Sequence, residues 1–152
     1  MKFEEYAKRS VQELFSDVLI KKASVYNFNY NASCLAINKG KGNFEIKKLP
    51  PFTQLSSINA ILITDINTDG KKDLILGGNL FYFQPQFSRL DASYGHVLIN
   101  KGKAEWELVM PQKSGIEVRG EVKSIVCFQS KERKQVLFLQ NDSPPLLYKL
   151  NE

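Results

Sequence analysis

The chain has 152 residues, and its 21 Lys and Arg against 16 Asp and Glu give a formal net charge of +5. No stripe of arginines with interleaved aromatic residues is present, and this disfavours a nucleic-acid-binding protein. Its two cysteines, Cys34 and Cys127, lie in apolar segments, so we expect buried free thiols rather than a disulfide. Composition alone therefore describes an ordinary folded protein and points to no specific function.

Residues 2–21 carry apolar side chains at three- and four-residue spacing, which predicts an amphipathic helix of about five turns. The apolar positions are Phe3, Tyr6, Ala7, Val11, Leu14, Phe15, Val18 and Leu19. Acidic residues are mixed into the polar face, which disfavours a membrane-surface helix. The segment is also too polar for a signal peptide or a transmembrane span. We therefore expect its apolar stripe to pack against the rest of the protein.

From Ser24 onward the pattern becomes β. Strands are predicted at 24–30, 33–38 and 43–49, and Pro50-Pro51 closes this first unit, which spans 24–50. A complete unit of four strands is predicted at 58–110. Its strands are expected at 60–65, 72–77, 95–100 and 104–109, with a long insert, Asn79 to Tyr94, between the second and third. A third unit of three strands is predicted at 121–150, with Pro144-Pro145 in its last turn.

These units contain an internal repeat. The segment Ile37-Asn38-Lys39-Gly40-Lys41 recurs as Ile99-Asn100-Lys101-Gly102-Lys103, and Phe44-Glu45-Ile46 then aligns with Trp106-Glu107-Leu108. Each copy has the pattern of a strand, a turn and a second strand. The strands around residues 60–77 have a weaker copy in 124–128 and 135–139, in which Leu74 aligns with Leu137 and Asn79 with Asp142.

The connection between the first two strands of the complete unit has the pattern of a cation-binding loop. Oxygen-bearing side chains stand at loop positions 1, 3, 5 and 9, and Gly70 at position 6 permits a sharp turn. We expect Ca²⁺ to be bound by side chains of Asp65, Asn67, Asp69 and Asp73 and by the backbone carbonyl of Lys71. Leu76 occupies the position where an EF-hand needs a bidentate Glu, so that motif is excluded. The alternative is an Asp/Asn/Gly-rich turn that binds no metal; the weaker copy has no ligands at the corresponding positions.

The loop with its flanking strands, together with the turn Gly40-Lys41-Gly42-Asn43-Phe44, resembles the FG-GAP or VCBS repeats of integrin-α-type β-propellers. The segment Leu90-Asp91-Ala92-Ser93-Tyr94-Gly95 is similar to the end region of bacterial VCBS-repeat proteins that carry UnbV-type domains. The resemblance implies a mainly β fold, a partial β-propeller of two to three four-stranded antiparallel blades with an N-terminal helix. It also implies a secreted, periplasmic or cell-surface bacterial protein that acts in adhesion or ligand binding.

A closed propeller needs about four to eight blades, and this chain supplies fewer. We treat residues 1–152 as one domain and expect it to be a fragment of a larger exported protein, with a homo-oligomer that completes the sheets as the alternative. The expected partners are a protein or glycan ligand, or the remaining blades of a longer chain. Nucleic acid and membrane insertion are not expected.

The insert is the predicted recognition surface, because aromatic residues and an arginine lie on a loop held by a sheet. The candidate ligand-binding residues are Tyr82, Phe83, Phe87 and Arg89; alternatively, these rings only cover the end of the sheet. A triad built on Ser93 and His96 lacks the context of an activated nucleophile, so we predict that His96 begins a strand and bonds locally. We expect no enzymatic activity. The alternatives are a lectin-type propeller and a non-catalytic propeller domain of a larger enzyme.

Overall fold

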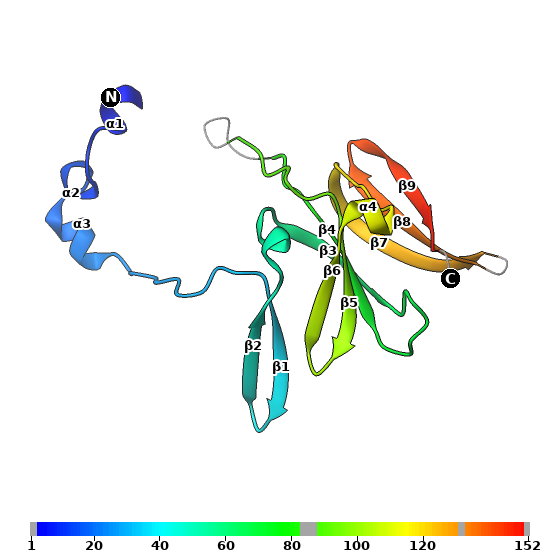
Figure 1. The fold of residues 1–152 in the computed structure, drawn as a ribbon. Helices are drawn as coiled ribbons and strands as arrows, with labels where there is room; N and C mark the ends of the chain where they lie inside the picture. Colours follow the sequence, from blue (N-terminus) through cyan, green and yellow to red (C-terminus); the bar gives the residue numbers. More distant parts are fainter. Residues whose placement is uncertain (1–2, 83–87, 131–132, 151–152) are drawn as a thin grey trace. The chain divides into compact units, whose positions relative to one another are not determined.

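The computed structural model describes residues 3–82, 88–130 and 133–150 and divides the chain into two compact units, residues 1–31 and 32–152 (Figure 1). A single domain was expected. The second unit is mainly β and contains three antiparallel sheets. Among the described residues, no helix is long and apolar enough to cross a lipid bilayer.

The first unit contains three short helices in place of the single helix predicted for 2–21. They are α1 (Phe3–Tyr6), α2 (Val11–Leu14) and α3 (Asp17–Lys22). Serines interrupt the pattern: Ser10 caps α2, with its backbone N–H bonded to Glu13 Oε2 at 2.7 Å, and Ser16 caps α3. Both serines lie in extended backbone, so each marks the start of a separate helix. No residue of α2 or α3 is buried.

The strand predicted at 24–30 is also absent. These residues have no regular structure, and Val25, Tyr26 and Phe28 are 81 to 93 % exposed. A strand needs a partner for its backbone groups, and no described strand pairs with this segment. Hydrophobic, β-favouring side chains alone therefore did not produce a strand here.

The second unit begins with a two-stranded sheet, β1 (Cys34–Gly40) and β2 (Asn43–Lys48), followed by the short 3-10 helix η1 (Pro51–Gln54). A four-stranded sheet follows, in the order β3 (Ile58–Thr64), β4 (Asp73–Gly78), β5 (His96–Gly102) and β6 (Glu105–Val109). The four strands predicted for 58–110 are thereby confirmed, with bounds shifted by one or two residues.

The helix α4 (Pro111–Ser114) leads to the third sheet, which has the order β7 (Glu121–Ser130), β8 (Arg133–Asn141) and β9 (Ser143–Lys149). The three strands predicted for 121–150 are confirmed. Pro144-Pro145, however, lie inside β9 and not in a turn. Because β9 is an edge strand, its outward side needs no N–H donors and tolerates proline.

The repeated turns have the same local geometry. Gly40 and Gly102 have φ of 84° and 83°, and each donates its N–H to the Oδ1 of the asparagine two positions earlier, Asn38 at 2.7 Å and Asn100 at 2.8 Å. A register shift occurs at the same point of both hairpins. The sequence repeat is thus a structural repeat of a bulged hairpin.

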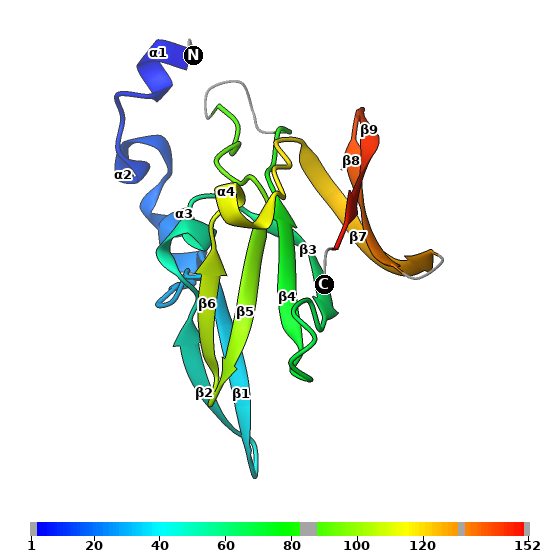
Figure 2. The ribbon, with the colours of Figure 1, turned by 45° about the vertical axis from the view of Figure 1, so that its right-hand side comes forward.

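Figure 2 shows the β1–β2, β3–β6 and β7–β9 sheets following one another. Two hydrophobic clusters join them. One cluster contains Leu74, Leu76 and Leu98 of the central sheet, with Leu49 and the partly buried Leu35 from the β1–β2 side. The other lies between the central sheet and β7–β9 and includes the fully buried Ile75, Val136 and Phe138. Both faces of the β3–β6 sheet therefore contribute to a cluster, although Ile61 and Ile63, which pair with Leu76 and Leu74 on the first face, stay 60 % and 62 % exposed. The loop that connects β3 to β4 leads directly into β4, in which every residue is buried.

Candidate metal loop and neighbouring pocket

The β3–β4 connection is ordered by hydrogen bonds to its own backbone. Asp65 Oδ2 accepts the N–H of Gly70 at 2.9 Å, Asn67 Oδ1 that of Asp69 at 3.3 Å, and Asp69 Oδ1 that of Lys71 at 2.9 Å. Gly70 has a φ of 81°, which agrees with its predicted role in the turn. The side-chain oxygens thus hold the loop in a wrapped form.

Asp73 is completely buried, and both of its carboxylate oxygens are used. Oδ2 accepts the backbone N–H of Ile66 at 2.8 Å, and Oδ1 accepts that of Asn100 at 2.8 Å. Asn100 also donates its side-chain amide to the Lys72 carbonyl at 3.0 Å. The last residue of the candidate ligand set therefore joins the loop to the repeated turn of β5–β6.

Two observations bear on whether the loop fits a cation. Asp65 Oδ1 is buried and has no hydrogen-bond partner among the described residues, which is a costly state for a carboxylate oxygen. On the other hand, Lys71 Nζ lies 2.8 Å from Asp69 Oδ2, and this contact lowers the pKa of Asp69. Over residues 3–82, 88–130 and 133–150, no three His, Cys, Asp or Glu side chains are gathered as a metal site.

The oxygen ligands of the loop are thus suitable for a cation in type and spacing, but the Asp69 carboxylate forms an ion pair with Lys71 of the same loop. A second lysine, Lys134 of β8, donates to the backbone carbonyl of Asp65 at 3.0 Å. Lysine ammonium groups therefore supply the positive charge near the aspartates. The predicted binding of Ca²⁺ stays a prediction.

The insert shows only part of the predicted recognition surface, because Phe83 and Phe87 lie outside the described residues. Tyr82 is 93 % exposed. The Arg89 guanidinium lies 4.9 Å from the ring centroid of Phe81, and its Nε is 3.3 Å from Asp91 Oδ2. The structure records no contact between Tyr82 and Arg89, so their joint role in binding is untested.

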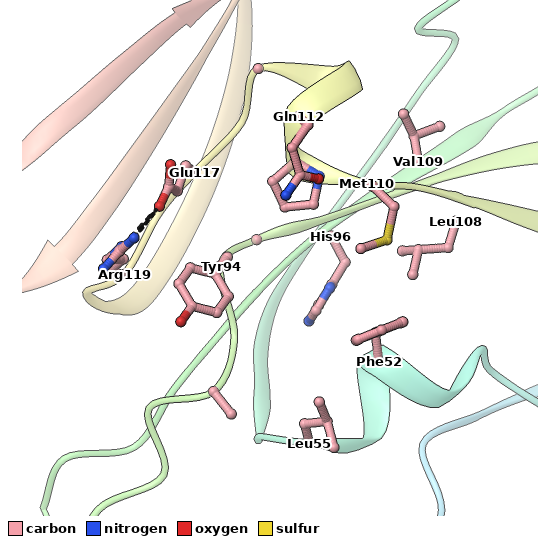
Figure 3. A pocket seen from close by; sticks show the side chains of 14 residues that line it. Phe52, Leu55, Tyr94, His96, Leu108, Val109, Met110, Gln112, Glu117 and Arg119 are labelled. Atoms are coloured by element: carbon pink, nitrogen blue, oxygen red, sulfur yellow. Dashed lines mark hydrogen bonds and ion pairs between the residues drawn. The ribbon is translucent and has the colours of Figure 1, made fainter.

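A pocket of about 550 Å³, which no sequence motif predicts, lies beside the start of β5 (Figure 3). Its apolar lining includes Phe52, Leu55, Leu108 and Met110. Figure 3 shows His96 between these residues and Tyr94. Aromatic residues far apart in the chain meet here only through the fold, so no local motif could have revealed the pocket.

The charged residues that line the pocket are paired with each other. Arg119 Nε donates to Glu117 Oε1 at 2.9 Å, and the Arg119 guanidinium lies 5.1 Å from the ring centroid of Tyr94. His96 begins β5, as predicted, and its Nε2 lies 3.3 Å from Ser93 Oγ. Ser93 is only 2 % exposed, so its hydroxyl is poorly placed to attack a substrate. Burial also lowers the pKa of His96.

Comparisons of this chain with family models, curated proteins and solved structures found no match. The resemblance to FG-GAP and VCBS repeats stays a prediction, as do the expected location outside the cytoplasm and the absence of enzymatic activity.

Proposed function

We propose that this protein is a non-catalytic β-repeat module, of β-propeller type, in which Ca²⁺ bound to the β3–β4 loop stabilises the fold and the module binds a protein or glycan outside the cytoplasm. The observation that carries the calcium part is the buried Asp65 Oδ1 without a partner. It belongs to an all-oxygen donor set, the kind that Ca²⁺ prefers.

The bound ion would be held by Asp65, Asn67, Asp69 and Asp73 together with the carbonyl of Lys71. Asp69 would then exchange Lys71 Nζ for the ion. Bound Ca²⁺ would offset carboxylate repulsion and crosslink β3 to β4. By mass action it would stabilise the fold by about 2.7 kcal/mol at a hundredfold excess over its dissociation constant.

Thermal unfolding in Ca²⁺ and in EDTA tests this proposal. We expect Ca²⁺ to raise the Tm of the unmodified protein and to leave the Tm of Asp69→Ala unchanged. Asp69 is a suitable position because its hydrogen bonds are exposed and lie within the loop. Asp91→Ala, which removes an exposed carboxylate of the insert, is the matched control and should respond to Ca²⁺ like the unmodified protein. An unmodified protein with the same Tm in Ca²⁺ and EDTA would show that the loop is only a turn.

A glycan is the second candidate ligand, at the insert. The exposed ring of Tyr82 supports it, because an aromatic face in solvent is available to stack against a sugar. Binding on a glycan array that is lost in Tyr82→Ala and kept in Tyr26→Ala would support this function. Tyr26 is the control because it is similarly exposed, at 82 %, and lies outside the insert.

A further inference from the structure

The packing of residues 32–152 gives each sheet two distinct faces. In the central β3–β6 sheet, the face that carries Leu74 and Leu98 packs toward the preceding sheet, β1–β2. The opposite face, which carries Ile75 and Val97, packs toward the following sheet, β7–β9. We call the first the front face and the second the back face. Inside this unit, the back face of one sheet therefore packs against the front face of the next, and on the central sheet this contact leaves Ile61 and Ile63 of the front face 60 % and 62 % exposed.

The β7–β9 sheet has a buried front face and an uncovered back face. Ile125, Val136 and Phe138 lie on its front face and are buried against the central sheet. The cross-strand pairs Val126–Leu137 and Leu137–Leu147 place the alternate residues on its back face. The exposed large hydrophobic residues of this back face are Val126 at 43 %, Phe128 at 41 %, Leu139 at 37 % and Leu147 at 53 %.

The internal repeat identifies the front face of the β1–β2 sheet. Phe44 and Ile46 occupy the positions that Trp106 and Leu108 hold in the second copy, and both hairpins have the same register. In the second copy these residues pack against the cluster on the front face of the central sheet. In the first copy Phe44 is 57 % exposed and Ile46 is 50 % exposed. The unit thus presents an uncovered front face at one end.

The two uncovered faces belong to opposite sides of the stack. The central sheet lies between β1–β2 and β7–β9, so the two end faces of one copy cannot meet (Figure 1). Exposed apolar faces of this kind mark interaction surfaces. Edge pairing is a poorer alternative at the β9 end, because Pro144-Pro145 lack N–H donors.

We propose that the partner of each end face is a second copy of this chain: the back face of β7–β9 in one copy covers the front face of β1–β2 in the next. The contact joins two different surfaces and is therefore heterologous, head to tail. This inference rests on the proposed role as a β-repeat module and is independent of calcium binding. Association is accordingly measured both in Ca²⁺ and in EDTA, so failure of the metal loop and failure of the interface are distinguishable.

Sedimentation equilibrium of the full chain tests the interface. We expect the average mass of the unmodified protein to rise with concentration in both buffers. Phe44→Asp alters the front end and Phe128→Asp the back end, and each should weaken self-association at least about tenfold, because a carboxylate in an apolar contact costs more than 1.4 kcal/mol. Both side chains are more than two-fifths exposed, so the substitutions should leave the fold intact. Circular dichroism checks this, and Leu147→Asp is the second variant for the back end.

Mixing the variants gives the decisive result. Phe44→Asp keeps an intact back face and Phe128→Asp keeps an intact front face, so their mixture should form a 1:1 dimer that grows no further. Val18→Asp, at a 62 % exposed position of the N-terminal unit, is the control and should associate like the unmodified protein. A monomeric unmodified protein, a mixture without dimers, or association lost in Val18→Asp would each overturn the proposal. The last result would assign the contact to the N-terminal segment.

Discussion

The carboxylate of Asp73 accepts a hydrogen bond at 2.8 Å from the backbone N–H of Asn100, which lies 27 positions later in the chain. Asp73 is the first residue of β4, and Asn100 lies in β5, in the segment of the internal repeat that is identical in both copies. With Ile66 on the other oxygen, the fully buried carboxylate connects the β3–β4 loop to the β5–β6 hairpin. The residue predicted as a metal ligand therefore has a structural role that needs no metal.

The first prediction follows from this bond. Asp73→Asn keeps the shape of the side chain but replaces one acceptor oxygen with an NH₂ group that faces a backbone N–H. We expect the free energy of unfolding to fall by about 1–3 kcal/mol, since a buried donor is left without an acceptor. Urea unfolding in EDTA measures this loss without any contribution from bound metal. Asp69→Asn is the control, because its bonds are exposed; an equal loss in both variants would contradict the assigned role of Asp73.

The loop pattern was visible in the sequence because its residues are consecutive, and spacing alone defines a wrapped turn. The sequence could not reveal that Asp73 bonds to Asn100, or that Lys134 reaches the Asp65 carbonyl, since these partners meet only after the sheets form. The pocket around His96 was missed for the same reason. Local spacing predicts local chemistry, whereas long-range contacts depend on topology.

The strands of residues 32–152 were predictable because alternating or continuous apolar runs were bounded by Gly, Asn and Pro. The N-terminal segment was not, because Ser10 and Ser16 could be either exposed positions of one helix or caps of separate ones. Residues 24–30 resembled a strand in composition, yet a strand forms only when a neighbour satisfies its backbone groups. Residues 24–30 therefore form no strand because no described strand pairs with them, and such pairing cannot be read from one segment alone.

Asn79, for which the sequence predicts no structural role, is the basis of the second prediction. Its buried side chain accepts the Ser93 N–H at 2.8 Å and donates to the carbonyls of Ser93, Arg119 and Gly120 at 2.8 to 3.2 Å. Asn79→Ala leaves several of these buried groups unpaired. We expect a loss of about 3 kcal/mol or more in the free energy of unfolding, measured with urea.

A control at an exposed asparagine separates this effect from asparagine loss in general. Asn38→Ala removes one exposed bond to Gly40 and should cost less than about 1 kcal/mol. Similar losses in Asn38→Ala and Asn79→Ala would show that the Asn79 network does not hold these segments together.

The third prediction concerns the close approach of β7 to the end of β4. A Cβ added at Gly77 would lie 2.5 Å from Val122 Cγ1, a side-chain atom, whereas one added at Gly78 would clash with the backbone carbonyl oxygen of Ser57. Both Gly77→Ala and Gly78→Ala should therefore destabilise the protein. Val122→Ala removes the nearest atom but keeps Val122 Cβ, which would lie 2.8 Å from the added Cβ, so it should relieve the first substitution in part. It should not relieve the second, because the obstacle at Gly78 is backbone.

A double-mutant cycle measures this difference. We expect a favourable coupling of about 0.5–3 kcal/mol between Gly77→Ala and Val122→Ala, from urea unfolding of the single and double variants. The matched cycle of Gly78→Ala with Val122→Ala should show no such coupling. Equal coupling in both cycles would mean that β7 does not pack against Gly77 as described.

The fourth prediction is a pH dependence that comes from His96. Burial holds the pKa of His96 in the folded protein below its ordinary value, which is about 6.5 in an unfolded chain. Between these two values the unfolded chain binds the proton more readily than the folded protein, so protonation favours unfolding. Stability should accordingly fall as the pH is lowered below about 6.5. Urea unfolding from pH 8 to pH 5 measures it, and in His96→Gln this part of the slope should be absent. The same slope in both proteins would assign the acid sensitivity to other groups.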